Sequence, residues 1–334
     1  MSLYVKLSRT LLAICCLVPL AACEENSGSF IMNGEYTGTG SVTIGVGETS
    51  IENLYPRGGR VSPVGVITGL DGTEWTVPAD NNYNNAAFPF APDLYNPDGV
   101  QRASSSAALA SFDPADIITI DTGGDLITGY IFADNYFELY VNGVPVGKDA
   151  IPFTEFNSHI VQFRVSAPYT IAMKLVDWEE NLGIGSEANT SYAFHPGDAG
   201  VVAVFKNESG AIVAATGADW KAQTFYTAPI YDLSCLSEVG EVRNSSQCSA
   251  ADQHFGAAFG AVHWPIPADW ADASFDDSSW PDATTFTNEE AGVSNKPSFT
   301  NFTDIFDDPA RDAQIIWSTN LVLDNEVIAR YTVQ

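Results

Sequence analysis

The stretch ADNYFELYVNGVPVG, residues 133–147, carries the clearest structural signal in the chain of 334 residues. Its side chains alternate, so that Phe137, Leu139 and Val141 share one face of a strand and the residues between them share the other. Asn142 and Gly143 follow, and both residue types accept the positive φ angles of a type I′ turn. The stretch therefore predicts a β-hairpin with one face directed into a core.

Short β-type segments bounded by turn residues continue on both sides of this hairpin. Helical spacing of apolar residues is weak and confined to 101–109 and 252–261. The expected strands include 41–46, 60–67, 117–120, 129–132, 160–165, 170–176, 200–205, 212–215, 315–317 and 327–333. Many short strands without alternating β–α units predict an all-β protein, a β-sandwich or jelly roll with long loops and few short helices.

Three further segments follow the hairpin along the chain: GAIVAATGADWK at 210–221, FDDSSWP at 275–281 and IIW at 315–317. Together with the hairpin, and in this order, they resemble segments of the galactose-binding-like jelly rolls. The segment at 210–221 departs from the family pattern, because Gly217 and Ala218 separate Thr216 from Asp219. The resemblance covers roughly 115–333 and implies a jelly-roll fold that often holds a structural Ca²⁺. It says little about the ligand.

The first 22 residues have the pattern of a secretory signal peptide, with Lys6 and Arg9 before an apolar run at 10–20. LAAC at 20–23 resembles the bacterial lipobox, which implies that Cys23 is acylated and anchors the protein in a membrane. Glu24 follows where enteric lipoproteins of the inner membrane have Asp, so the resemblance favours the outer membrane, on its periplasmic or cell-surface side. The alternative is ordinary signal cleavage with Cys23 incidental.

After the signal peptide, the sequence divides into three parts. Residues 23–40 are expected to form a tether, since the stretch after Cys23 is polar and contains Gly and Ser. Residues 41–114 are expected to form an N-terminal β segment of the same globule, because no linker marks a boundary near residue 100. Residues 115–334 are expected to form the sandwich.

Only two cysteines remain beyond Cys23 in a chain that is expected to be exported. Cys235 and Cys248 are therefore predicted to form a disulfide that closes a polar, irregular loop. The alternative, a pair of metal thiolates, is less favoured because their spacing is wrong for a zinc knuckle and no His lies between them.

The charge of the chain restricts its partners. It has 42 Asp and Glu against 14 Lys and Arg, a formal net charge of −28, yet 45% of its residues are hydrophobic. The apolar content is enough for a folded core. The acidity excludes nucleic acid and an anionic membrane face as main partners, so contact with the membrane is expected through the lipid alone.

The best candidate ligand site combines two stretches. Trp178 follows the expected strand 170–176 among carboxylates, where its indole could stack on a sugar or shield the strand end. Core positions are expected instead for Trp220, Trp280 and Trp317. The predicted carbohydrate-binding residues are Asp134, Asn135, Tyr136, Asp177, Trp178, Glu179 and Glu180.

Acid-rich turns raise the possibility of a structural Ca²⁺, which prefers six to eight oxygen ligands. The candidate ligands are Asp121, Asp125, Asp304 and Asp308. No EF-hand spacing is present, and solvated turn carboxylates are the alternative.

No motif of a hydrolase, a metalloprotease or a phosphate-binding enzyme occurs in the sequence. We therefore expect no catalytic residues and a non-catalytic envelope protein that binds carbohydrate. Two alternatives stay open: a polysaccharide hydrolase that uses loop carboxylates, and a structural envelope protein that assembles with its own copies.

Overall fold

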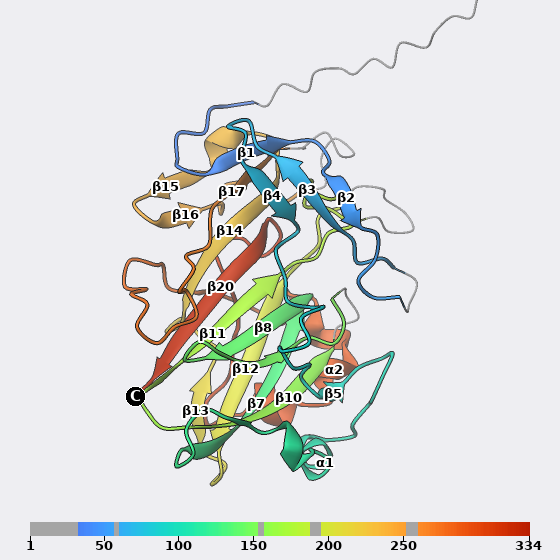
Figure 1. Cartoon of the computed structure of the whole chain (residues 1–334), viewed down its shortest axis with the longest axis vertical. Coiled ribbons are helices and arrows are strands. Elements are labelled where there is room, and N and C mark those ends of the chain that lie inside the picture. The colour runs from blue at the N-terminus through green and yellow to red at the C-terminus, as the bar shows by residue number, and fades with distance from the viewer. Residues whose placement is uncertain (1–32, 57–59, 153–156, 188–194, 252–259) are drawn as a thin grey trace, which may run out of the picture. The chain divides into compact units, whose positions relative to one another are not determined.

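A computed structural model describes residues 33–56, 60–152, 157–187, 195–251 and 260–334 (Figure 1). The predicted signal peptide, Cys23 and the first part of the predicted tether lie outside the described residues. Residues 32–334 form one compact unit. Strands dominate this unit, so the prediction of an all-β sandwich is confirmed.

The first large sheet has seven strands, all paired antiparallel. In spatial order they are β1 (Ser41–Ile44), β17 (Gly260–His263), β14 (Lys221–Ile230), β20 (Asp324–Val333), β11 (Tyr169–Val176), β8 (Tyr136–Val141) and β9 (Val144–Lys148). The C-terminal strand β20 is central, and Figure 1 shows it beside β11.

The second large sheet has eight strands. Its main path is β18 (Thr284–Phe286), β19 (Ile315–Trp317), β12 (Gly200–Asn207), β7 (Asp125–Asp134), β10 (Ser158–Val165) and β5 (Asp93–Tyr95). Off this path, β13 (Ile212–Ala215) pairs with β12, and β6 (Ile118–Thr119) pairs in parallel with β10. The main core contains side chains from both large sheets, as the two layers of a sandwich require.

Short helical elements pack beside these sheets. The α-helices of the described ranges are α1 (Ser105–Ala110), α2 (Pro297–Thr300) and α3 (Thr303–Phe306), and the 3₁₀ turns are η1 (Pro114–Asp116), η2 (Leu233–Cys235) and η3 (Val293–Asn295). Phe299 of α2 packs edge-on against Phe132 of β7, so these helices extend the core beyond the second sheet. In the described part of the chain, no helix is long and apolar enough to cross a membrane.

Two small sheets complete the unit. One contains β2 (Glu48–Ile51), β3 (Val64–Thr68) and β4 (Glu74–Val77), and the other is the hairpin of β15 (Ser237–Val239) and β16 (Val242–Asn244). Cys235 and Cys248 flank this hairpin and are bonded to each other, which confirms the predicted disulfide.

The hairpin of β8 and β9 has the predicted turn. Asn142 and Gly143 have φ angles of 50° and 78°, and Asn142 Oδ1 accepts a hydrogen bond from Thr170 N at 2.8 Å. Phe137, Leu139 and Val141 enter the main core as expected. The opposite face of β8 is also covered, because the segment before β5 packs on it and buries Glu138 completely.

The N-terminal segment 41–114 contributes to both large sheets, through β1 and β5. The described end of the predicted tether, 33–40, also contacts the folded unit. The Tyr36 hydroxyl bonds to the Glu238 carboxylate, and the Tyr36 ring packs edge-on against Trp264. In the structure, therefore, this stretch packs on the globule and is not a free spacer.

Candidate functional site

The structure brings the two predicted ligand-binding stretches together. Asn135 lies between β7 and β8, and its Oδ1 accepts a hydrogen bond from Trp178 N, just beyond β11, at 2.6 Å. The rings of Tyr136 and Trp178 pack edge to face with centroids 5.7 Å apart. The two loops are therefore neighbours at one end of the first sheet.

These residues nevertheless face inward. The Trp178 indole is fully buried, and its Nε1 donates to Pro63 O at 2.9 Å. Tyr136 is fully buried as well, and Asn135 is 3% exposed. Six of the seven residues predicted for this site are buried; the seventh, Glu180, is half-buried and lies 3.6 Å from Arg60. The Trp178 indole shields the strand end here and offers no face to a sugar.

Buried carboxyl groups gather behind this strand end. Burial raises the pKa values of Asp134 and Asp177 well above their ordinary range, and the nearby acids Asp198 and Glu187 raise them further. Burial also raises the pKa of Glu179 to about 8, although its carboxylate accepts hydrogen bonds from Tyr226 Oη, at 2.8 Å, and from the Gly183 amide. Asp134, Asp177 and Glu179 therefore keep their protons to a higher pH than exposed carboxyl groups do.

The predicted calcium ligands lie in separate places. Asp121 Oδ2 accepts from Ser166 N at 2.8 Å, whereas Asp304 Oδ2 accepts from Ser105 Oγ at 2.9 Å. Asp308 accepts from Ala310 N, and Asp125 is exposed at the start of β7. No three His, Cys, Asp or Glu side chains within the described ranges converge on a metal position. Calcium binding stays a prediction from the sequence.

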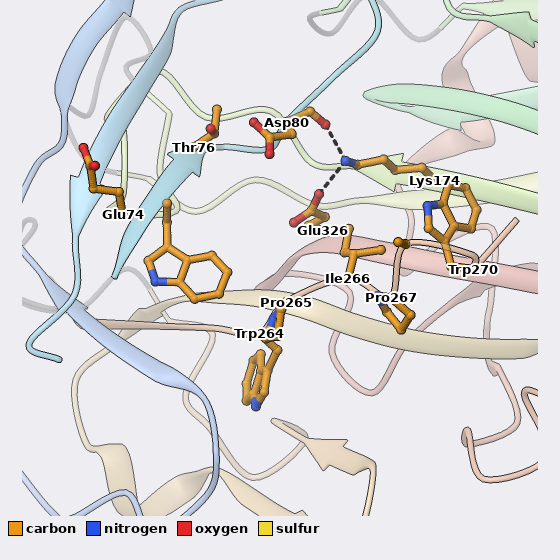
Figure 2. Close-up of a pocket in the computed structure, with 12 residues that line it drawn as sticks. Glu74, Thr76, Asp80, Lys174, Trp264, Pro265, Ile266, Pro267, Trp270 and Glu326 are labelled. Atoms are coloured by element: carbon orange, nitrogen blue, oxygen red, sulfur yellow. Dashed lines mark hydrogen bonds and ion pairs between the residues drawn. The ribbon is translucent and has the colours of Figure 1, made fainter. Parts of the chain in front are cut away.

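A pocket of about 410 Å³ opens on the outer face of the seven-stranded sheet (Figure 2). Residues from four distant parts of the chain line it: Glu74, Trp75, Thr76, Asp80, Lys174, Trp264, Pro265, Ile266, Pro267, Ala268, Trp270 and Glu326. Figure 2 shows Glu74 and Trp270 at opposite sides, with Glu326 and Ile266 between them.

Strand β4 supplies one wall through Glu74, Trp75 and Thr76. The Trp75 indole is half-buried and stacks on His263, with ring centroids 5.3 Å apart, and His263 stacks in turn on Tyr226 at 4.3 Å. His263 is fixed by Thr43 Oγ1, 3.0 Å from its Nε2, and burial lowers its pKa to about 3. A neutral imidazole therefore supports the indole.

The loop after β17 supplies the opposite wall. Pro265 and Pro267 restrict its backbone, and the half-buried Trp270 packs edge-on against Tyr140 at 5.1 Å. Arg330 of β20 bonds to the carbonyl oxygen of Trp270 and, at 3.1 Å, to that of Asp272. The guanidinium of Arg330 thus fixes the main chain that carries the Trp270 ring.

Lys174 of β11 and Glu326 of β20 form the floor. Their Nζ and Oε1 atoms lie 2.9 Å apart, and Lys174 Nζ also donates to the main-chain oxygen of Asp80. Burial acts to lower the pKa of Lys174, but Glu326 and Glu138 outweigh it and the pKa is raised. The ammonium group is therefore charged and already engaged by the protein.

All seven tryptophans lie in described ranges, and they divide into buried residues and residues that reach the surface. Five are buried: Trp178, Trp220, Trp264, Trp280 and Trp317. In Figure 2 the Trp264 indole points away from Glu326 and Lys174, toward the smaller core behind the pocket. The remaining two, Trp75 and Trp270, reach the surface, and both line this pocket.

Reasoning from the sequence did not identify this pocket. The one local signal is WPIPADW at 264–270, a loop in which two prolines stand between two tryptophans. Such a loop is stiff and cannot continue a central strand, so its aromatic residues are candidates for a surface. The other walls come from β4, β11 and β20, which no local motif connects.

Comparison with protein-family models, with curated proteins and with solved structures finds no match to this chain.

Proposed function

We propose that this protein is a non-catalytic, lipid-anchored protein of the cell envelope that binds carbohydrate in the pocket between Trp75 and Trp270. One observation carries the proposal: the only two of seven tryptophans that reach the surface line the same pocket. Two half-buried indoles that reach the surface in one concavity are typical of a recognition site.

The chemistry of the lining suits a sugar ring. A pyranose has an apolar face of C–H groups, which packs on an indole, and a rim of hydroxyl groups, which donate to carboxylates. Glu74 and Asp80 are exposed at the edge of the pocket and can accept such hydrogen bonds. The pocket volume of about 410 Å³ lies within the usual range for small-ligand sites.

The walls are held by other parts of the fold before any ligand arrives. Trp75 rests on the stack with His263, and the Trp270 main chain is held by Arg330. Such preorganisation lowers the entropic cost of binding, because the side chains are already ordered. Rings held in fixed positions also fit a binding site better than they fit a surface where the rings have no ligand to position.

The anchor and the envelope location rest on the sequence alone. The lipobox-like LAAC at 20–23 supports acylation of Cys23 and an outer-membrane position. The resemblance to galactose-binding-like jelly rolls, which serve as accessory domains of secreted surface proteins, agrees with a binding role.

A glycan array probed with the purified protein tests the proposal, with and without Ca²⁺ and with a chelator. We expect retention on at least one glycan, together with a change in tryptophan fluorescence on titration. Absence of binding to every glycan under all three conditions would rule the proposal out. Release of new reducing ends that is abolished by Glu74→Gln or Asp80→Asn would favour the hydrolase alternative.

A further inference from the structure

The charge of the pocket restricts which sugars it can take. Three acids line it, Glu74, Asp80 and Glu326, and Lys174 is the one cation among its lining residues. Glu326 compensates Lys174 at 2.9 Å, and both side chains are about nine-tenths buried on the floor. What remains for a ligand is the pair of exposed carboxylates, Glu74 and Asp80.

Lys174 is the one lining group that offsets these carboxylates: its charge acts on Asp80 through space, but Glu326 compensates it more strongly. Lys174 Nζ donates to the main-chain oxygen of Asp80 and not to its carboxylate. Glu138, the residue opposite Lys174 on β8, does not change this balance, because Lys148 of β9 also lies opposite it and compensates its charge. The chain as a whole carries a formal charge of −28, which strengthens the negative potential at the pocket.

The two indoles also favour a positively charged ligand. The face of a tryptophan ring attracts cations, and a protonated amine near Trp75 or Trp270 would gain this interaction as well as the attraction of the carboxylates. A uronic acid or a sulfated sugar would instead bring a negative charge to an acidic rim and would be repelled.

Resting on the function proposed above, we propose that the pocket selects amino sugars that carry a free, protonated amine over their neutral and anionic counterparts. Glu74 and Asp80 recognise the ammonium group, while Trp75 and Trp270 hold the ring that bears it. Each exposed ion pair contributes a modest amount, so two pairs predict roughly 2- to 30-fold tighter binding than for the neutral sugar at low ionic strength.

Calorimetric titration of the full chain with four β-linked oligosaccharides of one length tests this selection. They are an oligomer of glucosamine, its N-acetylated form, the glucose oligomer and a uronic-acid oligomer. The protein is kept in a detergent without a sugar headgroup, since a glycosidic headgroup would compete for the pocket. We expect affinity to fall in the order amine, neutral, anionic, and the amine preference to shrink at high salt.

The double variant Glu74→Gln with Asp80→Asn should abolish the preference, so that the glucosamine and glucose oligomers bind with equal affinity. Glu208→Gln, at an exposed acid outside the pocket, is the matched control and should keep the preference. Equal affinities for the amine, acetylated and glucose oligomers, or tightest binding of the uronic acid, would overturn the selection alone. Binding of none of the four would overturn the selection, and if the glycan array also shows no binding, the carbohydrate pocket itself is overturned.

Discussion

Whether a tryptophan of this chain faces solvent depends on which segment covers it. Trp220, Trp280 and Trp317 are core residues, as expected for tryptophans of a β-sandwich. Trp178 is buried because residues such as Leu54, Val64 and Ala79 of the N-terminal segment pack over it. That covering layer is remote in sequence, so exposure at this position could not be read from local pattern.

Truncating either surface indole should weaken glycan binding. We expect Trp75→Ala and Trp270→Ala each to reduce affinity about 5- to 30-fold, which corresponds to about 1–2 kcal/mol for an aromatic anchor. Calorimetry against the best ligand of the array measures the change. Tyr231→Ala removes an aromatic ring that is 37% exposed outside the pocket, and it should leave affinity unaltered. Equal losses for all three variants would contradict a localised site.

Glu179 should give the folded state a measurable dependence on pH. Its pKa is raised from about 4.5 to about 8, so the folded state keeps a proton that the unfolded state loses in this interval. The free energy of unfolding should therefore fall as pH rises from about 4.5 to 8, by up to about 1.4 kcal/mol per pH unit, and level off above.

Urea titrations at several pH values compare Glu179→Gln with the parent protein. Because the amide does not titrate, we expect a flatter profile for this variant across that interval, and the parent profile for Glu208→Gln. Parallel profiles for Glu179→Gln and the parent would show that the carboxyl group is ionised in the folded state.

At the scale of elements, a row of buried charges crosses the outer face of the first sheet. Glu138 of β8 lies opposite Lys148 of β9 and opposite Lys174 of β11, and Lys174 reaches Glu326 of β20. Lys148 Nζ donates to three main-chain oxygens between Asn82 and Asn85, the nearest at 2.7 Å. The row thereby binds the segment before β5 to the sheet.

Neutralising the centre of this row should be costly. We expect Glu138→Gln to lower the free energy of unfolding by about 3–5 kcal/mol, because the buried Lys148 and Lys174 would lose the negative charge that lies between them. Glu208→Gln, which removes an exposed pairing with Arg164 at 3.7 Å, should cost less than about 1 kcal/mol. Urea unfolding measures both. A loss for Glu138→Gln no larger than for the control would mean that this row does not hold the segment.

The turn of the β8–β9 hairpin was predictable because two adjacent residues determine it. Gly143 has a φ of 78°, and a Cβ there would lie 2.4 Å from Asp272 Oδ1. We expect Gly143→Ala to destabilise the protein by about 1 kcal/mol or more. Gly123→Ala is the matched control, since nothing lies within 4 Å of its Cβ position and its φ is not positive. Thermal unfolding midpoints that coincide for the two variants would contradict a strained turn.

At the scale of the whole molecule, alternation and turn residues were sufficient to predict an all-β sandwich and most of its strands. They were not sufficient for the pocket, which joins β4, Asp80, β11, the loop at 264–270 and β20. These parts lie too far apart in the sequence for the periodicity of any strand to show that they meet. The disulfide was predictable for a simpler reason, since Cys235 and Cys248 were the only pair left after Cys23.

Lipid attachment is a prediction for the complete protein in its native envelope. We expect Cys23→Ser to release the protein from sedimented membranes into the soluble fraction, because the anchor depends on this thiol. Cys235→Ser, at a disulfide cysteine, should remain with the membranes. Sedimentation of the Cys23→Ser protein with membranes at the parent level would contradict lipidation.

The central claim is that sugar binds between Trp75 and Trp270, and oxidative footprinting of the tryptophans tests it most directly. The full chain is oxidised by hydroxyl radicals with and without a saturating amount of the array ligand, and oxidation of each tryptophan is quantified by mass spectrometry. The account predicts that ligand protects Trp75 and Trp270 and leaves the five buried tryptophans unchanged. Saturating binding with no protection at these two residues would contradict it.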